Sequence, residues 1–495
     1  MSMNVSGLIS GLDTDNIISQ LMAVERQPIN LMETRQHTYE LRKSLWNEIN
    51  SSLLSLKTKG EAIATSEDLL TKKATSSDDT YFTAAAGSSA ADGTYAIDIT
   101  TIAKAQRVNG TTQSAEALNL SGTFTIGDGT YSSTIEVYAT DTLSTIMSRI
   151  NEAKDDADPT KSLDVSATIV NNTLVLQHKE TGSANQLVLT DTVNTAGSTG
   201  SDEILESLGI LTDAKTIQDE SQAAADAVFT VNGIAVTRSS NSGLTDVISG
   251  VTLSLKQEGV SGTLMVEKDV DAMVNSIKSW VEQYNSTIEL LSTRLSEEVV
   301  KGAESDAMKS RGLLRGNSIL SSTKSELRQN ISSNIEGLTV YTNLSQIGIM
   351  TTSSDYGKSG KLEIDETELR AALEANPEDV AKLFVNDEDL DGDGEISSDE
   401  QGVITRLESQ LDYLTSTSTK TIGGVTVKAG VIQARIEYES AVISDLADKI
   451  ADYEERLAKR EQSLYAQFTA METALSNLQN QASYLSSQLM SLYSE

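Results

Sequence analysis

Apolar residues recur at helical spacing near both ends of the 495-residue chain, whereas the middle alternates between apolar and polar residues. Asp13 is a candidate N-cap for a first helix, and Pro28, which suits a first helical turn, begins a second helix that runs to about Ile63. The apolar side of the first helix consists of Ile17, Ile18, Leu21 and Met22. Helical ends of this kind must pair with each other or with further copies, so the pattern predicts an assembly subunit.

The segment from Val431 to Tyr493 carries the longest periodic stripe of the chain. Steps of three and four residues alternate along it, as on the seam of a coiled coil, and Arg460 stands on the seam. Between Leu464 and Phe468 a step of four follows another step of four, a stutter that locally unwinds a left-handed supercoil. The seam residues that we expect to contact another helix are Leu446, Ile450, Leu457, Leu464, Phe468, Leu475, Leu478, Leu485 and Leu489. The alternative is a helix packed on its own domain, but the length of the stripe favours an intermolecular or end-to-end coiled coil.

Strand patterns fill the middle of the chain. Asn171-Asn172 turns a predicted hairpin between residues 165–170 and 173–177. One strand-rich block breaks off near Gly110, and comparable strands resume at Ala227. This order is what the insertion of one domain inside another produces.

Composition narrows the classes of function. The formal net charge is -34, which argues against nucleic acid or an anionic membrane as a partner, because counterion release needs a basic face. The sequence contains no cysteine, which excludes disulfides, thiolate metal sites and cysteine nucleophiles. The first residues lack the basic and apolar regions of a Sec signal, and no apolar run approaches the ~20 residues of a membrane span. Any export must therefore use another route.

The sequence carries no signature of an enzyme. We find no nucleophile elbow, no Walker loop and no dinucleotide-binding fingerprint. The two histidines, His37 and His178, have no nucleophile pattern beside them and are more typical of surface histidines than of general bases. We therefore expect a protein without catalytic activity.

Residues 389–400 match the twelve-residue calcium loop of an EF hand. Carboxylates occupy positions 1, 3, 5 and 12, Gly394 at position 6 allows the sharp turn, and Ile396 at position 8 is expected to pin the loop to what lies beneath it. The candidate ligands are Asp389, Asp391, Asp393, Glu395 (through its carbonyl), Ser397 and Glu400. Residues 377–384 and 400–414 read as flanking helices. We predict one Ca²⁺ of modest affinity and structural role, and the alternative is a solvated acidic turn.

Several short segments, all in the same order along the chain, resemble the flagellar filament cap family, also called hook-associated protein 2. They are Gly7–Asp15, Gln20–Met22, Glu25–Pro28, Gly93–Tyr95, Ala103–Val108, Gly250–Leu253, Tyr284–Ser286, Ile347–Ile349 and Gly360–Asp365. Each segment alone is weak, but their shared order over nearly the whole chain is specific. The calcium loop departs from the family pattern, in which a short turn stands at this place, so its metal is inferred from this sequence alone.

The resemblance completes the predicted fold. It implies a multidomain α+β protein with antiparallel coiled-coil terminal helices, a helical leg domain and two strand-rich head domains, the second inserted in the first. The expected segments are 1–45 and 431–495 for the terminal coiled coil, 46–75 and 270–430 for the leg, 76–111 and 224–269 for the first head, and 112–223 for the second head.

The resemblance also implies a function and a location. The chain is expected to cap the distal end of the flagellar filament as a homo-oligomeric ring, a pentamer or hexamer, that promotes polymerisation of exported flagellin and so supports elongation and motility. Its expected partners are flagellin, the hook–filament junction proteins and an export chaperone. It is expected to leave the cell through the flagellar type III system and to reside outside at the flagellum tip.

Two other functions remain open at this point. The polar loops of the heads suggest a surface adhesin that binds mucin or host glycans. However, only 4% of the residues are aromatic, which gives little stacking surface for sugars. Flagellin itself shares helical ends, but the segments named above do not resemble it.

Overall fold

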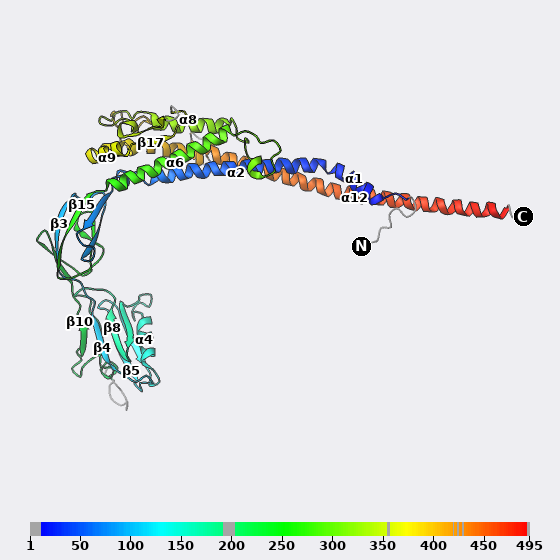
Figure 1. Ribbon diagram of the computed structural model, residues 1–495. Coiled ribbons are helices and arrows are strands. Elements are labelled where there is room, and N and C mark those ends of the chain that lie inside the picture. The colour runs from blue at the N-terminus through cyan, green and yellow to red at the C-terminus, as the bar shows by residue number, and fades with distance from the viewer. Residues whose placement is uncertain are drawn as a thin grey trace. The chain divides into compact units, whose positions relative to one another are not determined.

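The computed structural model describes residues 11–191, 203–353, 357–418, 420–422, 425–427 and 430–492 (Figure 1). The chain divides into two compact units, one formed by Met1–Leu69 together with Val274–Glu495 and the other by Leu70–Met273. Long helices dominate the first unit and antiparallel sheets the second. The predicted multidomain α+β class is therefore confirmed.

The terminal helices of the first unit are α1 (Thr14–Glu25), α2 (Gln27–Glu61) and α12 (Val431–Leu492). The Asp13 carboxylate accepts the Asn16 N–H at 3.1 Å and caps α1, as the sequence suggested. Helix α12 lies along α2 and continues along α1 (Figure 1). The direction is antiparallel, since Gln36 reaches the Ile443 carbonyl whereas Arg26, nearer the N-terminus, pairs with Glu454. The predicted antiparallel pairing of the chain ends is confirmed.

The rest of the first unit packs shorter elements around α2 and a long helix, α6. These elements are α3 (Ser66–Leu69), α6 (Val270–Ser296), α7 (Asp306–Lys309), α8 (Ser318–Ser332), the 3-10 helix η1 (Leu344–Ile347), β16 (Ile349–Thr351), β17 (Leu362–Ile364), α9 (Glu366–Ala375), α10 (Pro377–Val385), α11 (Val403–Thr415), β18 (Lys420–Ile422) and β19 (Val425–Val427). Trp280 of α6 is 1% exposed, and its ring lies edge-on to Phe384 of α10 with 6.0 Å between centroids. Aromatic packing of this kind joins elements that are far apart in the sequence.

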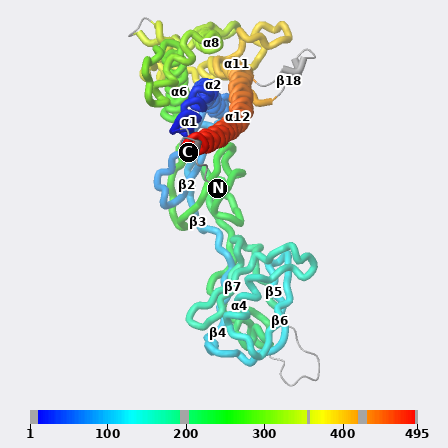
Figure 2. Tube along the Cα trace, turned by 90° about the vertical axis from the view of Figure 1, so that its right-hand side faces the viewer, coloured from blue at the N-terminus to red at the C-terminus, as the bar shows by residue number. Residues whose placement is uncertain are grey.

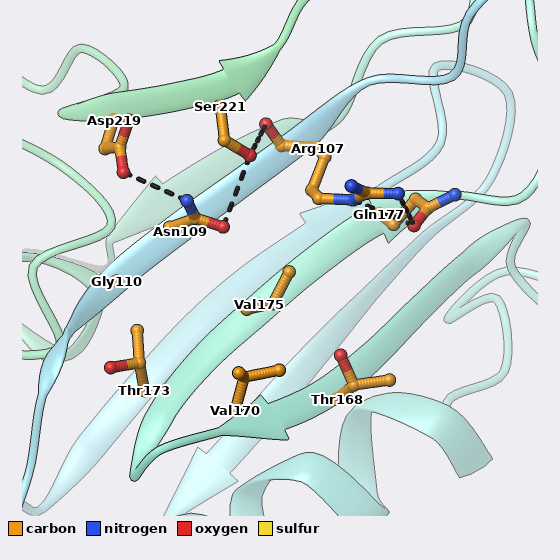
Figure 3. A pocket seen from close by; sticks show the side chains of 10 residues that line it. All are labelled: Arg107, Asn109, Gly110, Thr168, Val170, Thr173, Val175, Gln177, Asp219 and Ser221. Carbon is orange, nitrogen blue, oxygen red and sulfur yellow. Dashed lines mark hydrogen bonds between the residues drawn. The ribbon is translucent and has the colours of Figure 1, made fainter.

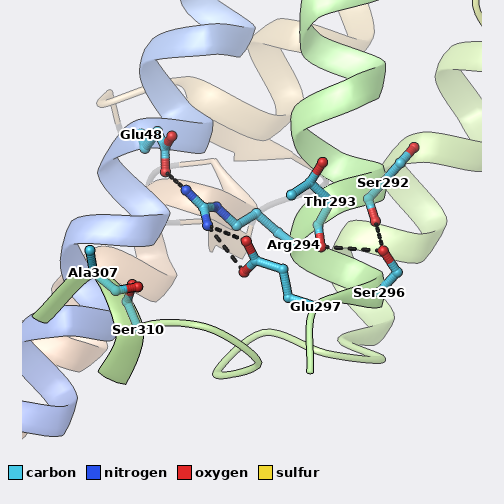
Figure 4. Close-up of polar contacts among 8 residues, drawn as sticks. All are labelled: Glu48, Ser292, Thr293, Arg294, Ser296, Glu297, Ala307 and Ser310. Atoms are coloured by element: carbon cyan, nitrogen blue, oxygen red, sulfur yellow. Dashed lines mark hydrogen bonds and ion pairs between the residues drawn. The ribbon is translucent and has the colours of Figure 1, made fainter. Parts of the chain in front are cut away.

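One ion-pair group links α6 to α2 (Figure 4). The Arg294 guanidinium donates to Glu48 at 2.7 Å and to Glu297 at 2.9 Å. Its side chain is only 17% exposed, so water screens these contacts less than it screens surface pairs. The contact holds the end of α6 against the middle of α2.

The second unit contains two separate apolar cores. The first lies between a five-stranded sheet in the order β1-β15-β3-β11-β12 and a three-stranded sheet in the order β13-β14-β2. These strands are β1 (Lys72–Ser76), β2 (Phe82–Ala86), β3 (Gly93–Thr101), β11 (Ala227–Val231), β12 (Ile234–Arg238), β13 (Leu244–Ile248), β14 (Val251–Leu255) and β15 (Val260–Lys268). Phe82 and Phe229 are fully buried in this core.

The second core lies between the sheets β10-β4-β8-β7 and β6-β5-β9. Its elements are β4 (Arg107–Thr112), β5 (Gly122–Gly127), β6 (Ser132–Val137), α4 (Leu143–Glu152), β7 (Val165–Val170), β8 (Thr173–His178), β9 (Val188–Asp191), α5 (Ile204–Ser207) and β10 (Asp219–Gln222). Helix α4 packs against β7 (Figure 2). The hairpin of β7 and β8 turns at Asn171 and Asn172, both with positive φ, as the sequence predicted. The chain runs from the first core into the second and back, so the predicted insertion is confirmed.

Two of the expected segment limits differ from the strand pairing. Residues 72–75 were expected in the helical leg, but they belong to β1, which pairs with β15 in the first head sheet. Residues 107–111 were expected in the first head, but β4 pairs with β8 and β10 and buries Val108 in the second core. Each strand follows the sheet that satisfies its backbone, and such long-range pairing leaves no local trace in the sequence.

The aromatic packing gives a stability prediction. Trp280→Ala should lower the free energy of unfolding of the first unit by about 3–5 kcal/mol, because the substitution empties a buried site beside Phe384. Urea unfolding followed by far-UV circular dichroism measures the change. Tyr413→Ala, at a position that is 62% exposed, is the matched control and should stay within about 0.5 kcal/mol. Equal effects of the two substitutions would contradict the assignment of Trp280 to the core.

Candidate functional sites

Three of the expected calcium ligands lie together in the loop between α10 and α11. Single carboxylate oxygens of Asp389, Asp391 and Asp393 fall within 4.8 Å of one another, and all three side chains are exposed. The Asp389 carboxylate accepts the N–H groups of Gly392 at 2.6 Å and Gly394 at 2.8 Å, which curls the loop around it. Both glycines have positive φ, as such a turn requires.

Glu400, the expected ligand at position 12, accepts hydrogen bonds from the backbone of the loop. Its carboxylate is buried and accepts the backbone N–H groups of Leu390 at 2.8 Å, Asp391 at 2.9 Å and Ser397 at 2.9 Å. It does not belong to the group of three aspartates. Its position therefore closes the loop on itself, because one side chain ties the first residues of the loop to the last.

The chain on either side of the loop is held together by close backbone contacts, whereas Ile396 within the loop is exposed. Ile396 is 47% exposed, so the expectation that it pins the loop is wrong. The Gly402 N–H donates to the Asn386 carbonyl at 2.9 Å, and a Cβ at Gly402 would lie 2.4 Å from the Phe384 carbonyl oxygen. The predicted flanking helices exist as α10 and α11, and α11 begins at Val403, after this glycine.

The terminal interaction residues divide into a covered group and an open group. Ile18, Leu446 and Leu464 are buried within the chain itself. Ile17, Met22, Ile450, Leu457, Phe468 and Leu475 are half-buried. Leu21, Leu478, Leu485 and Leu489 are 45%, 61%, 58% and 55% exposed. The α1 and α2 helices thus cover the first part of the stripe on α12, and the seam becomes exposed between Leu475 and Leu478, beyond the stutter at Leu464 and Phe468.

The seam also contains a buried residue that the sequence pattern did not single out. Continued backward from Ile443, the steps of three and four pass through Glu439, Ile436 and Ile432. Glu439 is 0% exposed. A search for apolar residues passes over Glu439. The steps of three and four, followed to the start of α12, identify it as a charged residue at a seam position. Arg460, the polar seam residue noted in the sequence, pairs with Glu25 of α1 at 3.2 Å.

An open groove of about 650 Å³ lies on the outer face of the sheet β10-β4-β8-β7 (Figure 3). Its polar side is ordered by Asn109, which donates to Asp219 at 3.0 Å, and by Arg107, which donates to Gln177 at 3.1 Å. The ten residues that line it include no aromatic side chain. The groove therefore offers no stacking platform for a sugar ring, and nothing in it favours the adhesin alternative.

Neither histidine has the surroundings of a catalytic base. His37 lies 2.8 Å from Asp306 on α7 and stands on the surface of α2. The expectation of a surface histidine is wrong for His178, which is buried and whose ring nitrogens contact the Glu180 and Asp128 backbone carbonyls at 3.1 and 3.2 Å.

Among the described residues, no helix is both long and apolar enough to cross a membrane.

Terminal helices that pair with each other, with sheet domains between them in the sequence, are typical of a structural component of an assembly. The sequence profile of the flagellar hook-associated protein 2 C-terminus matches residues 224–480, and that of its N-terminus matches residues 10–106. The first match alone spans more than half of the chain. The chain therefore belongs to the flagellar hook-associated protein 2 family, as its short sequence segments suggested.

Relatives and a solved structure agree with this membership over most of the chain. The flagellar hook-associated protein 2 of Halalkalibacterium halodurans is 28% identical over 546 residues, covering 98% of this chain and 99% of the relative. That of Escherichia coli is 28% identical over 501 residues, covering 98% of each. The crystal structure of three domains of the flagellar cap protein FliD from Escherichia coli matches with a TM-score of 0.59 and 27% identity, covering 80% of this chain and 99% of that one.

The contacts of Glu400 predict a pH effect on the loop. Backbone N–H groups, that of Ser397 first and then those of Asp391 and Leu390, hold the pKa of the Glu400 carboxyl below its ordinary value of 4.5. The unfolded chain therefore binds the proton more readily, so this stabilisation is complete above pH 4.5 and is lost as the pH falls through the lowered pKa.

Urea unfolding of the full chain at pH 7 and at pH 3.5 measures this effect. Glu400→Gln should lower the stability at pH 7 and narrow the difference between the two pH values. Glu395→Gln, at an exposed position of the same loop, is the control and should leave the difference as in the wild type. An unchanged pH difference in Glu400→Gln would refute the role given to its carboxylate.

Proposed function

We propose that this protein caps the distal end of the flagellar filament as a homo-oligomeric ring and has no enzymatic activity. The cap promotes polymerisation of exported flagellin, and so supports filament elongation and motility. Family membership supports this function, and one structural observation indicates which residues make the contacts within the cap. That observation is the row of exposed apolar side chains on the last turns of α12.

The row is too apolar for a surface that faces only water. Leu478, Leu485 and Leu489 repeat at seam spacing, and Tyr484 and Met490 beside them are 63% and 74% exposed. Burying a leucine side chain contributes about 1.5–3 kcal/mol, so each residue of the row favours association with another apolar surface. We infer that neighbouring copies and the filament end supply that surface.

The proposed location and partners follow from this role. The protein acts outside the cell at the flagellum tip, in contact with flagellin and, before elongation, with the hook–filament junction proteins. It is exported through the flagellar type III system, with a chaperone protecting it beforehand. The ring holds five or six copies. The net charge of -34 keeps an associating chain soluble and leaves nucleic acid and membrane surfaces outside its proposed partners.

Substitutions on the open row test the capping role. Leu485→Ser combined with Leu489→Ser should weaken association by about 3–6 kcal/mol and abolish swimming and filament growth in a strain that lacks its own cap protein. Secretion of the variant should remain, so that loss of export does not imitate loss of capping. Soft-agar motility and electron microscopy of the filaments provide the readouts.

The matched control for this test is Ser483→Ala combined with Ser486→Ala, at exposed positions of the same turns. It should swim as the wild type does. Full motility of the leucine double variant, with filaments of normal length, would overturn the proposed role of the row.

We further propose that the loop 389–400 binds one Ca²⁺ and that the metal stiffens the connection between α10 and α11. The specific support is the convergence of Asp389, Asp391 and Asp393 within 4.8 Å, a set of hard oxygens suited to calcium. With these carboxylates, the Glu395 carbonyl, the Ser397 side chain and the Glu400 carboxylate would form the ligand set. Glu400 also accepts backbone N–H groups of the loop, which holds its carboxylate in place.

Isothermal titration of the full chain tests the metal. The wild type should bind one Ca²⁺ with a dissociation constant of about 10⁻⁴–10⁻³ M, as in extracellular calcium modules. Asp391→Asn combined with Asp393→Asn should abolish the binding heat, whereas Asp387→Asn, an exposed position just before the loop, should keep it. Wild-type protein that gives neither heat nor a melting shift at millimolar calcium would refute this proposal.

A further inference from the structure

Glu439 occupies a place on α12 that the seam pattern reserves for an apolar residue. The seam steps from Ile432 to Ile436, Glu439, Ile443 and Leu446 are four, three, four and three residues. Ile432, Ile436 and Leu446 are buried, and Glu439 between them is 0% exposed. A charged residue at a buried seam position costs stability unless its environment compensates for the lost hydration.

Two arginines provide partial compensation. Arg435, one turn earlier on α12, places Nε 3.3 Å from Glu439 Oε1, and Arg42 of α2 places Nη1 3.8 Å from the same oxygen. Neither carboxylate oxygen of Glu439 accepts a hydrogen bond of good geometry, nor does Nε of either arginine donate one. Burial raises the pKa of the Glu439 carboxyl, against the opposing effects of Arg42, Arg435 and the Trp46 side chain. The cluster is therefore a poor source of stability.

The apolar seam does not by itself fix how far α12 extends along α2. A heptad pattern repeats every seven residues, so a slip of seven residues again sets apolar against apolar side chains. The charged cluster breaks this equivalence. With Arg42 opposite Glu439, a slip of seven residues would set Arg42 against Leu446 in one direction and against Ile432 in the other. When Arg42 faces Leu446, Glu439 faces Ile49 and has no arginine of α2 beside it. When Arg42 faces Ile432, Glu439 exchanges Arg42 for Arg35, which is exposed, so the slip toward Ile49 is the one that the charged cluster opposes most strongly.

We propose that Glu439, together with Arg42 and Arg435, sets the register in which α12 pairs with α2 of the same chain. A single buried polar residue at a seam position is a known means of selecting one register at a cost in stability. Two further charged contacts of α12, Glu454 with Arg26 and Arg460 with Glu25 of α1, are about half exposed and contribute little to the choice.

The register determines how much of α12 is left uncovered. Burial along the seam extends past Leu464, since Glu472 is buried and Leu475 half-buried, and the exposed row begins at Leu478. A slip of seven residues would move α12 by about 10 Å along α2, at 1.5 Å per residue, and would lengthen or shorten the open end by that amount. The inference concerns pairing within one chain and stands independently of the capping role, so its test does not use motility.

The absence of cysteine makes the register measurable by spin labels in the full-length protein. Ser44→Cys on α2 and Ala447→Cys on α12 are exposed and are offset along the helix pair, so a slip changes the distance between them. Pulsed electron–electron double resonance on the otherwise wild-type chain should give one narrow distribution of the distance between the two labels. Glu439→Leu should add a second distance or broaden the first by several ångströms, while helicity by circular dichroism and the thermal midpoint do not fall.

Two further variants keep the test decisive. Glu439→Gln preserves the shape of the side chain and should broaden the distance too, which decides the matter if the leucine variant fails to fold. Glu439→Arg with Arg42→Glu and Arg435→Glu restores opposite charges and should restore the single narrow distance. Glu437→Leu, at an exposed neighbour on α12, is the matched control. One unchanged narrow distance in both Glu439→Leu and Glu439→Gln would overturn the proposal, and so would failure of the charge reversal to restore it.

Discussion

The first unit depends on the antiparallel contact between α2 and α12. Helix α2 ends at Glu61 and α12 begins at Val431, so this contact closes a very long loop of chain. The entropic cost of closure rises only slowly with loop length, and a seam of buried apolar residues such as Trp46, Ile49 and Leu446 can offset it. Once the two helices pair, α6 and α11 have a fixed surface against which to pack.

Loop closure also explains the two cores of the second unit. Strand β3 pairs with β11, although the whole second core lies between them in the sequence. The backbone hydrogen bonds of β3 and β11 are satisfied side by side, and the intervening residues bury Phe124 and Leu176 in a core of their own. A domain can be inserted at such a place because its two ends leave from neighbouring strands.

Two polar sites in the first unit show opposite uses of a buried carboxylate. Glu400 meets three backbone N–H groups, which compensate for its burial and shape the loop that carries the three aspartates. Glu439 faces two imperfectly placed arginines and the side chain of Trp46, and we infer that it discriminates between registers rather than adding stability. The difference lies in hydrogen-bond geometry, since both residues are acidic side chains with almost no exposure.

The sequence alone determined those features that depend on neighbours within one or two turns. These are the α1 cap at Asp13, the break before Pro28, the hairpin at Asn171-Asn172, the long seam of α12 and the spacing of the aspartates in the loop. Only the tertiary structure decided what each surface meets. It assigned β1 and β4 to their sheets, turned Glu400 toward the backbone, left Ile396 exposed, and divided the seam into covered and open parts. The reason is physical: backbone geometry and side-chain periodicity follow from neighbouring residues, whereas burial and strand pairing depend on which other segments the folded chain brings into contact.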